Sequence, residues 1–267
     1  MAPTVLITGA SQGSGKATAL LFARKGYNVV LAARSPQTLE AAAADVRSLG
    51  MSALAIPTDV GDRAQVKSLV QKSLDFFGQV DVLVNNAGIC LTGSMAHTTS
   101  EDWQRIMDTN FWGYVYTIQA LLPQFLDRGS GVIVNVGSFG GKMPLPNMTA
   151  YCASKYAVAG LSETLHLELA PKGIHVAAVH PGVINSSFME RAMFRGGDSS
   201  EAQARRDQMQ SVLGSALVSQ PEDIAKAVWE AVSQKRAEVV VGPAAIATEA
   251  YRLVPGLTQW LLGRASS

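Results

Sequence analysis

The sequence predicts a single α/β domain built on a doubly wound, seven-stranded parallel sheet with helices on both faces. Short apolar runs alternate with helical patterns of roughly ten to sixteen residues, which is typical of right-handed βαβ units. The 267 residues are 48% hydrophobic and 16% charged, which is enough apolar material for a large core. No repeat, low-complexity tract or linker interrupts the pattern, so we expect one domain over residues 1–267.

The strands are expected where apolar runs end in turn-forming or polar residues. Strands of a parallel sheet read as nearly continuous apolar runs, because helices cover both faces. The predicted strands are Thr4–Thr8, Asn28–Ala33, Ala53–Pro57, Val80–Val84, Gly131–Val136, Ile174–Val179 and Ala237–Val241.

Helices are expected between the strands, where apolar residues recur at helical spacing. Asp62 and Ser100 are suitable N-terminal caps for two of them. The predicted helices are Lys16–Lys25, Pro36–Leu49, Asp62–Phe77, Glu101–Leu126, Tyr151–Ala170 and Pro221–Ser233. Residues 185–215 are polar and rich in Met and predict a helical lid, and residues 243–267 form a C-terminal extension.

Composition excludes several classes of function. A net charge of +1 provides no overall field to attract nucleic acid or an anionic membrane. Two cysteines, Cys90 and Cys152, are too few for a disulfide scaffold and fit a reducing compartment. The four histidines have no ligand spacing, so we expect no metal site. No apolar run reaches about 18 residues, and no leader precedes the first strand pattern, so we expect a cytoplasmic protein without a spanning segment.

A glycine cluster follows the first strand and opens the first helix. Without Cβ atoms the backbone can approach a pyrophosphate, and the helix N-terminus presents free N–H groups to it. The spacing, G-x-x-x-G-x-G, differs from the commoner G-x-G-x-x-G, so a simple tight turn is the alternative. In this context the cluster predicts a Rossmann fold with a dinucleotide on Gly9, Ser11, Gln12, Gly13, Ser14 and Gly15.

The end of the second strand predicts which dinucleotide is bound. In dinucleotide folds an acidic residue at this place holds the ribose 2′-hydroxyl, whereas an arginine accommodates a 2′-phosphate. No Asp or Glu stands between Asn28 and Gln37, and Arg34 and Ser35 supply a cation and a hydroxyl. We therefore expect NADP(H), with a solvated loop arginine as the alternative.

Tyr151, Lys155 and Ser138 are candidate catalytic residues. Tyr151 and Lys155 are four residues apart and share a helix face. A free phenol titrates at about 10, and a nearby ammonium favours the phenolate, so we expect Lys155 to lower the pKa of Tyr151. Ser138 stands thirteen residues before Tyr151, at the end of a strand, and can converge on the same point. Such a group suits hydrogen-bonding and protonating a carbonyl oxygen. The alternative is that Tyr151 and Lys155 are ordinary helix residues without a catalytic role.

Taken together, these residues resemble the short-chain dehydrogenase/reductase family over residues 4–242. The resemblance implies that Tyr151 is the proton donor or acceptor, that Ser138 hydrogen-bonds the substrate oxygen, and that Lys155 binds the nicotinamide ribose. It also implies that Asn110 holds a water that links Lys155 to solvent. The matching motifs are Thr8-Gly9-x-x-x-Gly13-x-Gly15, Asp59-Val60, Asn85-Asn86-Ala87-Gly88, Asn110, Ser138, Tyr151-x-x-x-Lys155 and Pro181-Gly182.

The same resemblance implies further cofactor contacts. Asp59 is expected to hold the adenine, and Ser186 to bond the nicotinamide carboxamide where the family usually has Thr. The remaining expected contacts are Val60, Asn86, Ala87, Gly88, Pro181, Gly182 and Ile184. Two features depart from the family pattern. Ser14 replaces a usual aliphatic residue, so we expect looser packing under the glycine turn. The C-terminal extension differs from the usual tetramer-forming segment.

The substrate is expected to enter between loop 143–148 and the lid. Apolar and Met side chains there predict a lipophilic ketone, aldehyde or alcohol rather than a sugar. These side chains are Met143, Leu145, Met148, Phe188, Met189, Met193 and Phe194. Four lid arginines suggest an anionic acyl carrier, but acidic residues are interleaved, so we expect a solvated helix face; these are Arg191, Arg195, Arg205 and Arg206.

The sequence thus predicts an NADP(H)-dependent oxidoreductase that resembles a carbonyl reductase, acts on a small molecule and forms a homodimer or homotetramer. A 3-oxoacyl-thioester reductase and a non-catalytic NADP(H) sensor are the alternatives. We expect the C-terminal extension to cover its own domain or a second copy, with peripheral membrane contact as the alternative.

Overall fold

The structure is a computed structural model that describes residues 2–184, 192–197, 203, 206–207 and 218–265. Its centre is a seven-stranded sheet in the order β3-β2-β1-β4-β6-β7-β9, with every strand pairing parallel. The strands are β1 Thr4–Thr8, β2 Asn28–Ala33, β3 Ala53–Pro57, β4 Val82–Asn85, β6 Gly131–Val136, β7 Ile174–Pro181 and β9 Glu238–Val241. The predicted doubly wound α/β class is confirmed.

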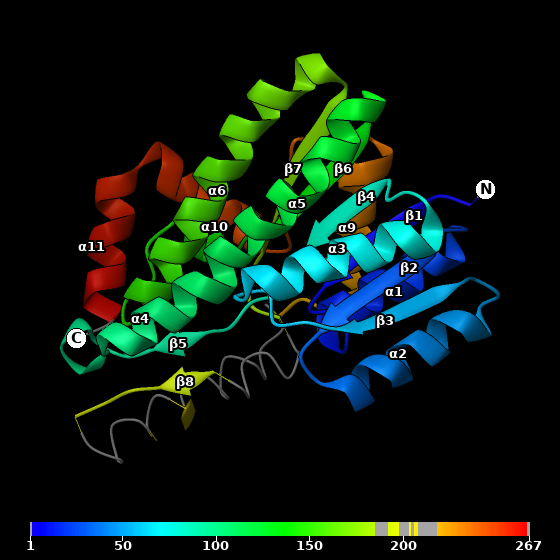
Figure 1. Cartoon of the computed structure of the whole chain (residues 1–267). Helices are drawn as coiled ribbons and strands as arrows, with labels where there is room; N and C mark the ends of the chain where they lie inside the picture. The colour runs from blue at the N-terminus through cyan, green and yellow to red at the C-terminus, as the bar shows by residue number, and fades with distance from the viewer. Residues whose placement is uncertain (1, 185–191, 198–202, 204–205, 208–217, 266–267) are drawn as a thin grey trace.

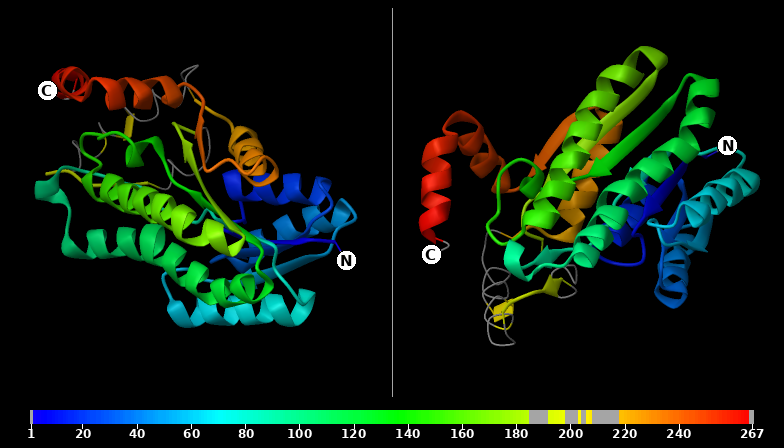
Figure 2. Two further views of the ribbon diagram at one scale, coloured as in Figure 1. Left: turned by 90° about the horizontal axis from the view of Figure 1, so that it is seen from above. Right: turned by 60° about the vertical axis from the view of Figure 1, so that its left-hand side comes forward.

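Helices cover both faces of the sheet, as Figures 1 and 2 show. On one face α1, α2 and α9 pack against the strands, and on the other face α3, α5 and α6 do so. The helices are α1 Gly13–Arg24, α2 Pro36–Ser48, α3 Arg63–Phe77, α4 Ser100–Met107, α5 Gly113–Arg128, α6 Thr149–Leu169, α9 Pro221–Ser233, α10 Ala244–Leu253 and α11 Pro255–Ala265.

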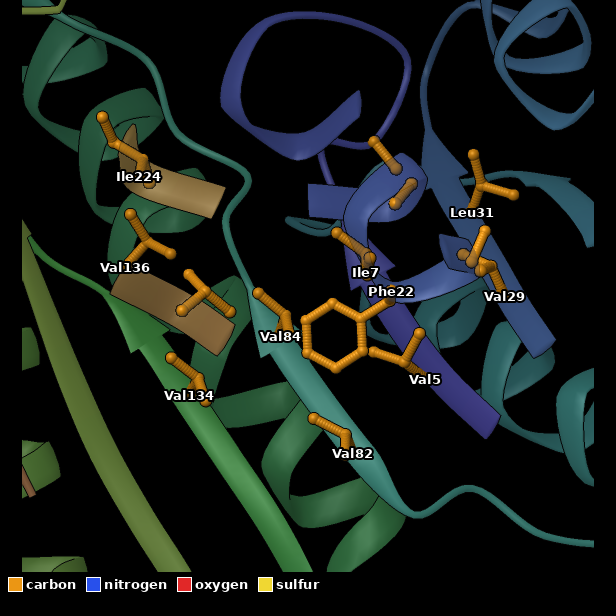
Figure 3. Close-up of a cluster of buried hydrophobic side chains, with 14 of the residues drawn as sticks. Val5, Ile7, Phe22, Val29, Leu31, Val82, Val84, Val134, Val136 and Ile224 are labelled. Atoms are coloured by element: carbon orange, nitrogen blue, oxygen red, sulfur yellow. The ribbon is translucent and has the colours of Figure 1, made fainter. Parts of the chain in front are cut away.

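Side chains that alternate between the two faces of the strands divide the hydrophobic core into two layers. Successive side chains of a strand point to opposite faces. In β1, Val5 and Ile7 join the layer that contains the Phe22 ring, as Figure 3 shows, whereas Leu6 joins the layer of Phe125. The side chains of both layers are buried, because aliphatic strand residues pack against helices on each face of the sheet.

Several predicted boundaries shift. The fourth strand begins at Val82 rather than Val80. Asp62 caps α3 as predicted, since its carboxylate accepts from the N–H groups of the first turn. The cap of α4 is Thr99, one residue before Ser100, because Thr99 forms a capping box with Asp102. The predicted helix 101–126 is interrupted by a π-helical turn at Asp108–Trp112.

A second, two-stranded sheet was not predicted. Strand β5, Leu91–Thr92, pairs in parallel with β8, Met193–Phe194. It ties the segment after β4 to a segment after β7. Most of the predicted lid, 185–215, lies outside the described residues.

The C-terminal extension forms helices α10 and α11. Helix α10 contacts β9 and the 3-10 turn Phe139–Gly141, and α11 packs on α10. Ile246, Leu253, Leu257 and Trp260 are each more than half exposed. None of the helices, as far as the structure describes them, is long and apolar enough to cross a membrane. The described residues also contain no cluster of side chains suited to a metal ion.

Candidate active site

One cavity of about 480 Å³ lies at the carboxyl ends of the central strands. The chain runs outward from β1 to β3, then returns to build β4 to β9 on the other side of β1, so β1 and β4 flank the point where the order reverses. Ligands of open α/β sheets bind at such a point. The cavity is lined by the glycine turn at one end and by Ser138, Tyr151 and Lys155 at the other.

The glycine turn needs its glycines for two different reasons. Gly9 and Gly13 have φ angles of +66° and +54°, which residues with a Cβ rarely adopt. A Cβ on Gly15 would overlap the carbonyl oxygen of Gly9 and lie 2.6 Å from Asn86 Nδ2. Gly15 is therefore required for packing behind the turn, and it is not among the residues that line the cavity.

Asn86 fixes this turn to the neighbouring strand. Its Nδ2 donates to the carbonyl oxygen of Thr8 at 3.0 Å, and its Oδ1 accepts from Ser14 Oγ at 2.8 Å. Thr8 Oγ1 accepts from the N–H groups of Asn86 and Ala87, both at 3.0 Å. The expected loose packing at Ser14 is therefore wrong, since a hydrogen bond replaces the aliphatic contact. The anchoring role of Thr8 was not predicted.

Polar residues line the part of the cavity beyond β2 and β3. Arg34, Ser35 and Thr38 follow β2, and Asp59 follows β3. Asp59 Oδ1 accepts from the N–H of Gly61 at 3.0 Å, which orients the carboxylate. The absence of an acidic residue at the end of β2 leaves Arg34 as the charged side chain there.

Ser138, Tyr151 and Lys155 converge as predicted, and each is less than one-tenth exposed. Ser138 lies two residues after β6 and caps the 3-10 turn Phe139–Gly141, in which its Oγ accepts from the N–H of Gly140 at 3.1 Å. Ser138 and Tyr151 share a hydrogen bond between their side chains. Lys155 Nζ donates to the carbonyl oxygen of Val136 at 3.0 Å and lies 6.0 Å from the centre of the Tyr151 ring.

The electrostatics of this group differ from the expectation. Burial raises the pKa of Tyr151 above its usual value, and the hydrogen bond with Ser138 opposes this only in part. The expected lowering of the Tyr151 pKa is therefore wrong, because loss of solvent raises this pKa. Burial also lowers the pKa of Lys155 to about 8. At neutral pH Tyr151 is thus a neutral phenol that can donate a proton, beside a charged lysine.

Asn110 lies in the π-helical turn and is fully buried. Its Oδ1 accepts from the N–H of Ile89 at 2.8 Å, and its Nδ2 donates to the Ile89 carbonyl oxygen and to Ser154 Oγ. It therefore ties the segment after β4 to α6, and it does not line the cavity. Its role in a water relay stays a prediction.

The other predicted residues divide into three sets. Nearly all of the expected cofactor residues line the cavity: Gly9, Ser11, Gln12, Gly13, Ser14, Arg34, Ser35, Asp59, Val60, Asn86, Ala87, Gly88, Tyr151, Lys155, Pro181, Gly182 and Ile184. Among the expected substrate residues, Ser138, Leu145 and Met148 line it, whereas Met143 is buried away from it. Ser186, Phe188 and Met189 lie outside the described residues.

Cys90 and Phe139 line the substrate end of the cavity and were not predicted. Phe139 directly follows Ser138, so its position in sequence was a usable signal. Cys90 packs with Tyr151, Phe194 and Met148, and this contact depends on the pairing of β5 with β8. Burial raises the pKa of the Cys90 thiol to about 12, so it acts as an apolar wall.

An ion pair holds the β8 segment in place. Arg195 donates to both carboxylate oxygens of Asp102, from Nε at 2.8 Å and from Nη2 at 2.7 Å. Asp102 is 6% exposed, and the hydrogen bond with Arg195 is the main reason that its pKa is lowered. The expected solvated helix face is therefore wrong for Arg195, which lies just after a strand. Arg206 stacks on the Phe194 ring, and Arg191 and Arg205 lie outside the described residues.

Comparisons with known proteins agree with this geometry. A family profile described as "short chain dehydrogenase" matches residues 3–196. A "Dehydrogenase/reductase SDR family protein 7-like" of Drosophila melanogaster is 32% identical over 97% of this chain and 79% of its own length. A "3-oxoacyl-[acyl-carrier-protein] reductase FabG" of Staphylococcus aureus is 35% identical over 88% of this chain and 92% of its own. A short chain dehydrogenase/reductase of Burkholderia phymatum, solved in complex with NAD, superposes with a TM-score of 0.88 at 27% identity, covering 96% and 95% of the two chains.

Proposed function

Since the chain belongs to the short chain dehydrogenase family, we propose that it is an NADP(H)-dependent oxidoreductase that interconverts a ketone or aldehyde and an alcohol. The observation that carries this proposal is the convergence of Ser138, Tyr151 and Lys155 in one buried group at the end of the cavity. The glycine turn at the other end, which lines the cavity with Gly9 and Gly13 at the N-terminus of α1, fits a dinucleotide pyrophosphate.

In the reducing direction each residue has a separate task. The nicotinamide, when bound, supplies the hydride. Ser138 Oγ donates a hydrogen bond to the carbonyl oxygen of the substrate, and Tyr151 donates the proton that completes the alcohol. The raised pKa of Tyr151 keeps that proton in place at neutral pH. The Lys155 ammonium lies beside the phenol and stabilises the negative charge that develops on it.

The preference for NADP(H) rests on Arg34. It lines the cavity beyond β2, where Ser35 supplies a hydroxyl and no carboxylate competes for the ribose. A guanidinium suits a 2′-phosphate because it can donate two parallel hydrogen bonds to it.

A lipophilic free carbonyl compound is the proposed substrate. Cys90, Phe139, Leu145 and Met148 surround the space in front of Ser138 with apolar groups. The second candidate is a 3-oxoacyl thioester, which the FabG relative favours. Against an acidic carrier, Arg195 is already neutralised by Asp102.

The test is reduction of a panel of carbonyl compounds, followed by the absorbance of NADPH or NADH. The panel contains a hydrophobic aryl ketone, a medium-chain aldehyde, a steroid ketone and an acetoacetyl thioester. We expect turnover of the free carbonyls with NADPH, lost in Tyr151→Phe by about a thousandfold while NADPH binding is kept. Tyr156→Phe, five residues along the same helix at an exposed position, is the control.

Each other outcome selects a different reading. Turnover of the thioester alone would favour the second candidate. Equal rates with NADH would contradict the role of Arg34. NADPH binding without turnover of any compound in the panel would favour a non-catalytic NADP(H) sensor.

A further inference from the structure

A buried histidine lies directly behind the catalytic serine. His180, in β7, is 0% exposed. Its Nδ1 lies 3.2 Å from the carbonyl oxygen of Ser138, and its Nε2 lies 3.1 Å from Glu238 Oε1. Glu238 begins β9 and pairs in register with Ala178, so it is a diagonal neighbour of His180 on the same face of the sheet.

Both ring nitrogens of His180 therefore face acceptors. A carbonyl oxygen carries no hydrogen, so Nδ1 must donate to Ser138. Contact with His180 above all, and then with Lys142, lowers the pKa of Glu238 to about 2. Nε2 of His180 makes no aligned hydrogen bond to Oε1, so the directional hydrogen bond of the ring is the one from Nδ1.

Lys142 holds Glu238 beside the ring. Its Nζ, from the loop after β6, binds the same Glu238 Oε1 at 2.5 Å and Glu163 of α6 at 3.0 Å. The loop after β6, helix α6 and strand β9 therefore meet next to His180.

The ring is also fixed against the backbone that carries Ser138. A Cβ at Gly137 would lie 2.6 Å from His180 Nδ1, so the imidazole rests directly on that glycine. On the other side of Gly137, the carbonyl oxygen of Val136 accepts from Lys155 and from Tyr114. The end of β6 is thus held by side-chain donors on both sides of Gly137.

We propose that His180, by donating from Nδ1 to the carbonyl oxygen of Ser138, is a positioning residue that fixes the main chain of Ser138 and hence the direction of its hydroxyl. Its kinetic consequence rests on the proposed function, but the hydrogen bond itself does not. We therefore expect the turnover number, and not the KM for NADPH, to depend on His180.

The first measurement is the ¹⁵N chemical shift of the histidine rings in the full-length protein, with the His180 signals assigned by their loss in His180→Asn. We expect Nδ1 of His180 to carry a proton, since it faces a carbonyl oxygen. An Nδ1 without a proton would overturn the proposal. This readout requires no activity, so it separates failure of this inference from failure of the proposed function.

The second measurement compares kcat and the KM for NADPH of His180 variants. The amide nitrogen of Asn can occupy the place of Nδ1 and donate to Ser138. We expect His180→Ala to lower kcat by about tenfold, and His180→Asn to restore most of it, with the KM for NADPH unchanged in both. Equal loss of kcat in both variants, or a KM that changes as much as kcat, would contradict the proposal.

Glu238→Gln keeps His180 in place and provides a test that does not depend on folding of the alanine variant, since Glu238 is partly exposed. The hydrogen bond from Nδ1 to Ser138 is kept, so kcat should stay close to that of the wild type. His175→Asn, a change on the same strand away from the cavity, should also leave kcat unchanged. A loss of kcat in Glu238→Gln as large as in His180→Ala would contradict the role of the Nδ1 hydrogen bond.

Discussion

Around Tyr151 and Lys155, burial dominates the proton equilibria. Both side chains have lost nearly all contact with water, so the neutral form of each is favoured. For Tyr151 this preserves a proton donor, and for Lys155 it brings the pKa down to about 8. A charged Lys155 is useful beside a developing phenolate, but it is costly to the fold. Function and stability therefore conflict at this residue.

Lys155→Met should make the protein inactive and more stable at neutral pH. Between about pH 8 and 10.4 the unfolded chain binds a proton that the folded chain releases, so Lys155 favours folding more as pH rises through this window. Below about pH 8 Lys155 is charged in the folded chain as well, so the full cost of desolvating its ammonium group opposes folding. We expect the variant to gain about 1–3 kcal/mol at pH 7 by urea unfolding, and the gain to vanish above about pH 10.5. Val136 keeps Tyr114 as a donor.

The exposed Lys172→Met serves as the control, since the same side chain is removed outside the core. We expect it to change unfolding by less than about 0.5 kcal/mol at either pH. Wild type that remains more stable than Lys155→Met at pH 7 would contradict the assigned burial cost.

Two short elements decide the shape of the cavity. The glycine turn brings the N-terminus of α1 against Asn86, and the β5–β8 pair brings Phe194 against Tyr151. In each case backbones approach too closely for larger side chains. Gly93 shows this for β5, because a Cβ there would lie 2.7 Å from Arg195 Cβ.

Gly15→Ala should damage folding and cofactor binding together. The added methyl group meets the backbone oxygen of Gly9, which cannot move without shifting the turn. We expect a loss of about 2–3 kcal/mol in stability and at least about tenfold weaker NADPH binding, measured by thermal unfolding and fluorescence titration. Gly160→Ala is the matched control, because its Cβ meets nothing within 4 Å in an exposed part of α6. It should be neutral or slightly stabilising; equal effects of the two changes would refute the steric argument.

Arg195→Ala should loosen β8 and expose the cavity. The change leaves the carboxylate of Asp102 with only its capping partners. We expect about 1–2 kcal/mol of destabilisation, moderated because Arg195 is partly exposed, and a raised KM for the carbonyl substrate. Arg195→Lys should recover part of both losses. An unchanged KM in Arg195→Ala would show that β8 does not shape the substrate space.

Across the whole molecule, the parallel sheet brings the ends of six strands to one cavity. The residues that follow these strands and line the cavity are Gly9, Arg34, Asp59, Asn86, Ser138 and Gly182. A dinucleotide that contacts all of these segments would tie both halves of the sheet together. Its binding should therefore stabilise the entire domain rather than one loop.

Thermal unfolding with cofactor tests both this coupling and the role of Arg34. At about 100 times its Kd, NADPH should add about 2.7 kcal/mol and raise Tm by about 5 °C. NADH at the same concentration should raise Tm less. Arg34→Ala should abolish the difference, whereas Arg24→Ala, an exposed arginine at the end of α1, should preserve it. A larger shift with NADH in wild type would disprove the NADP(H) preference.

Local patterns sufficed to predict the sheet, the glycine turn and the proposed catalytic group. Continuous apolar runs place strands, and glycine spacing places the turn, since both depend on neighbours in sequence. Tyr151 and Lys155 were predictable because helical spacing brings them together regardless of the rest of the chain. The π-helical turn at Asn110 was not, because its buried contacts come from Ile89 and Ser154.

Pairings between distant residues could not be derived from such patterns. Ser14 meets Asn86 across 72 positions of sequence, and Arg195 meets Asp102 across 93. Burial, which sets the sign of the Tyr151 pKa shift, arises only when all layers are packed. The sequence therefore determined the strands, the turn and the proposed catalytic group through short-range geometry. The tertiary structure decided the direction of their pKa shifts, because burial and contacts between distant residues arise only in the folded chain.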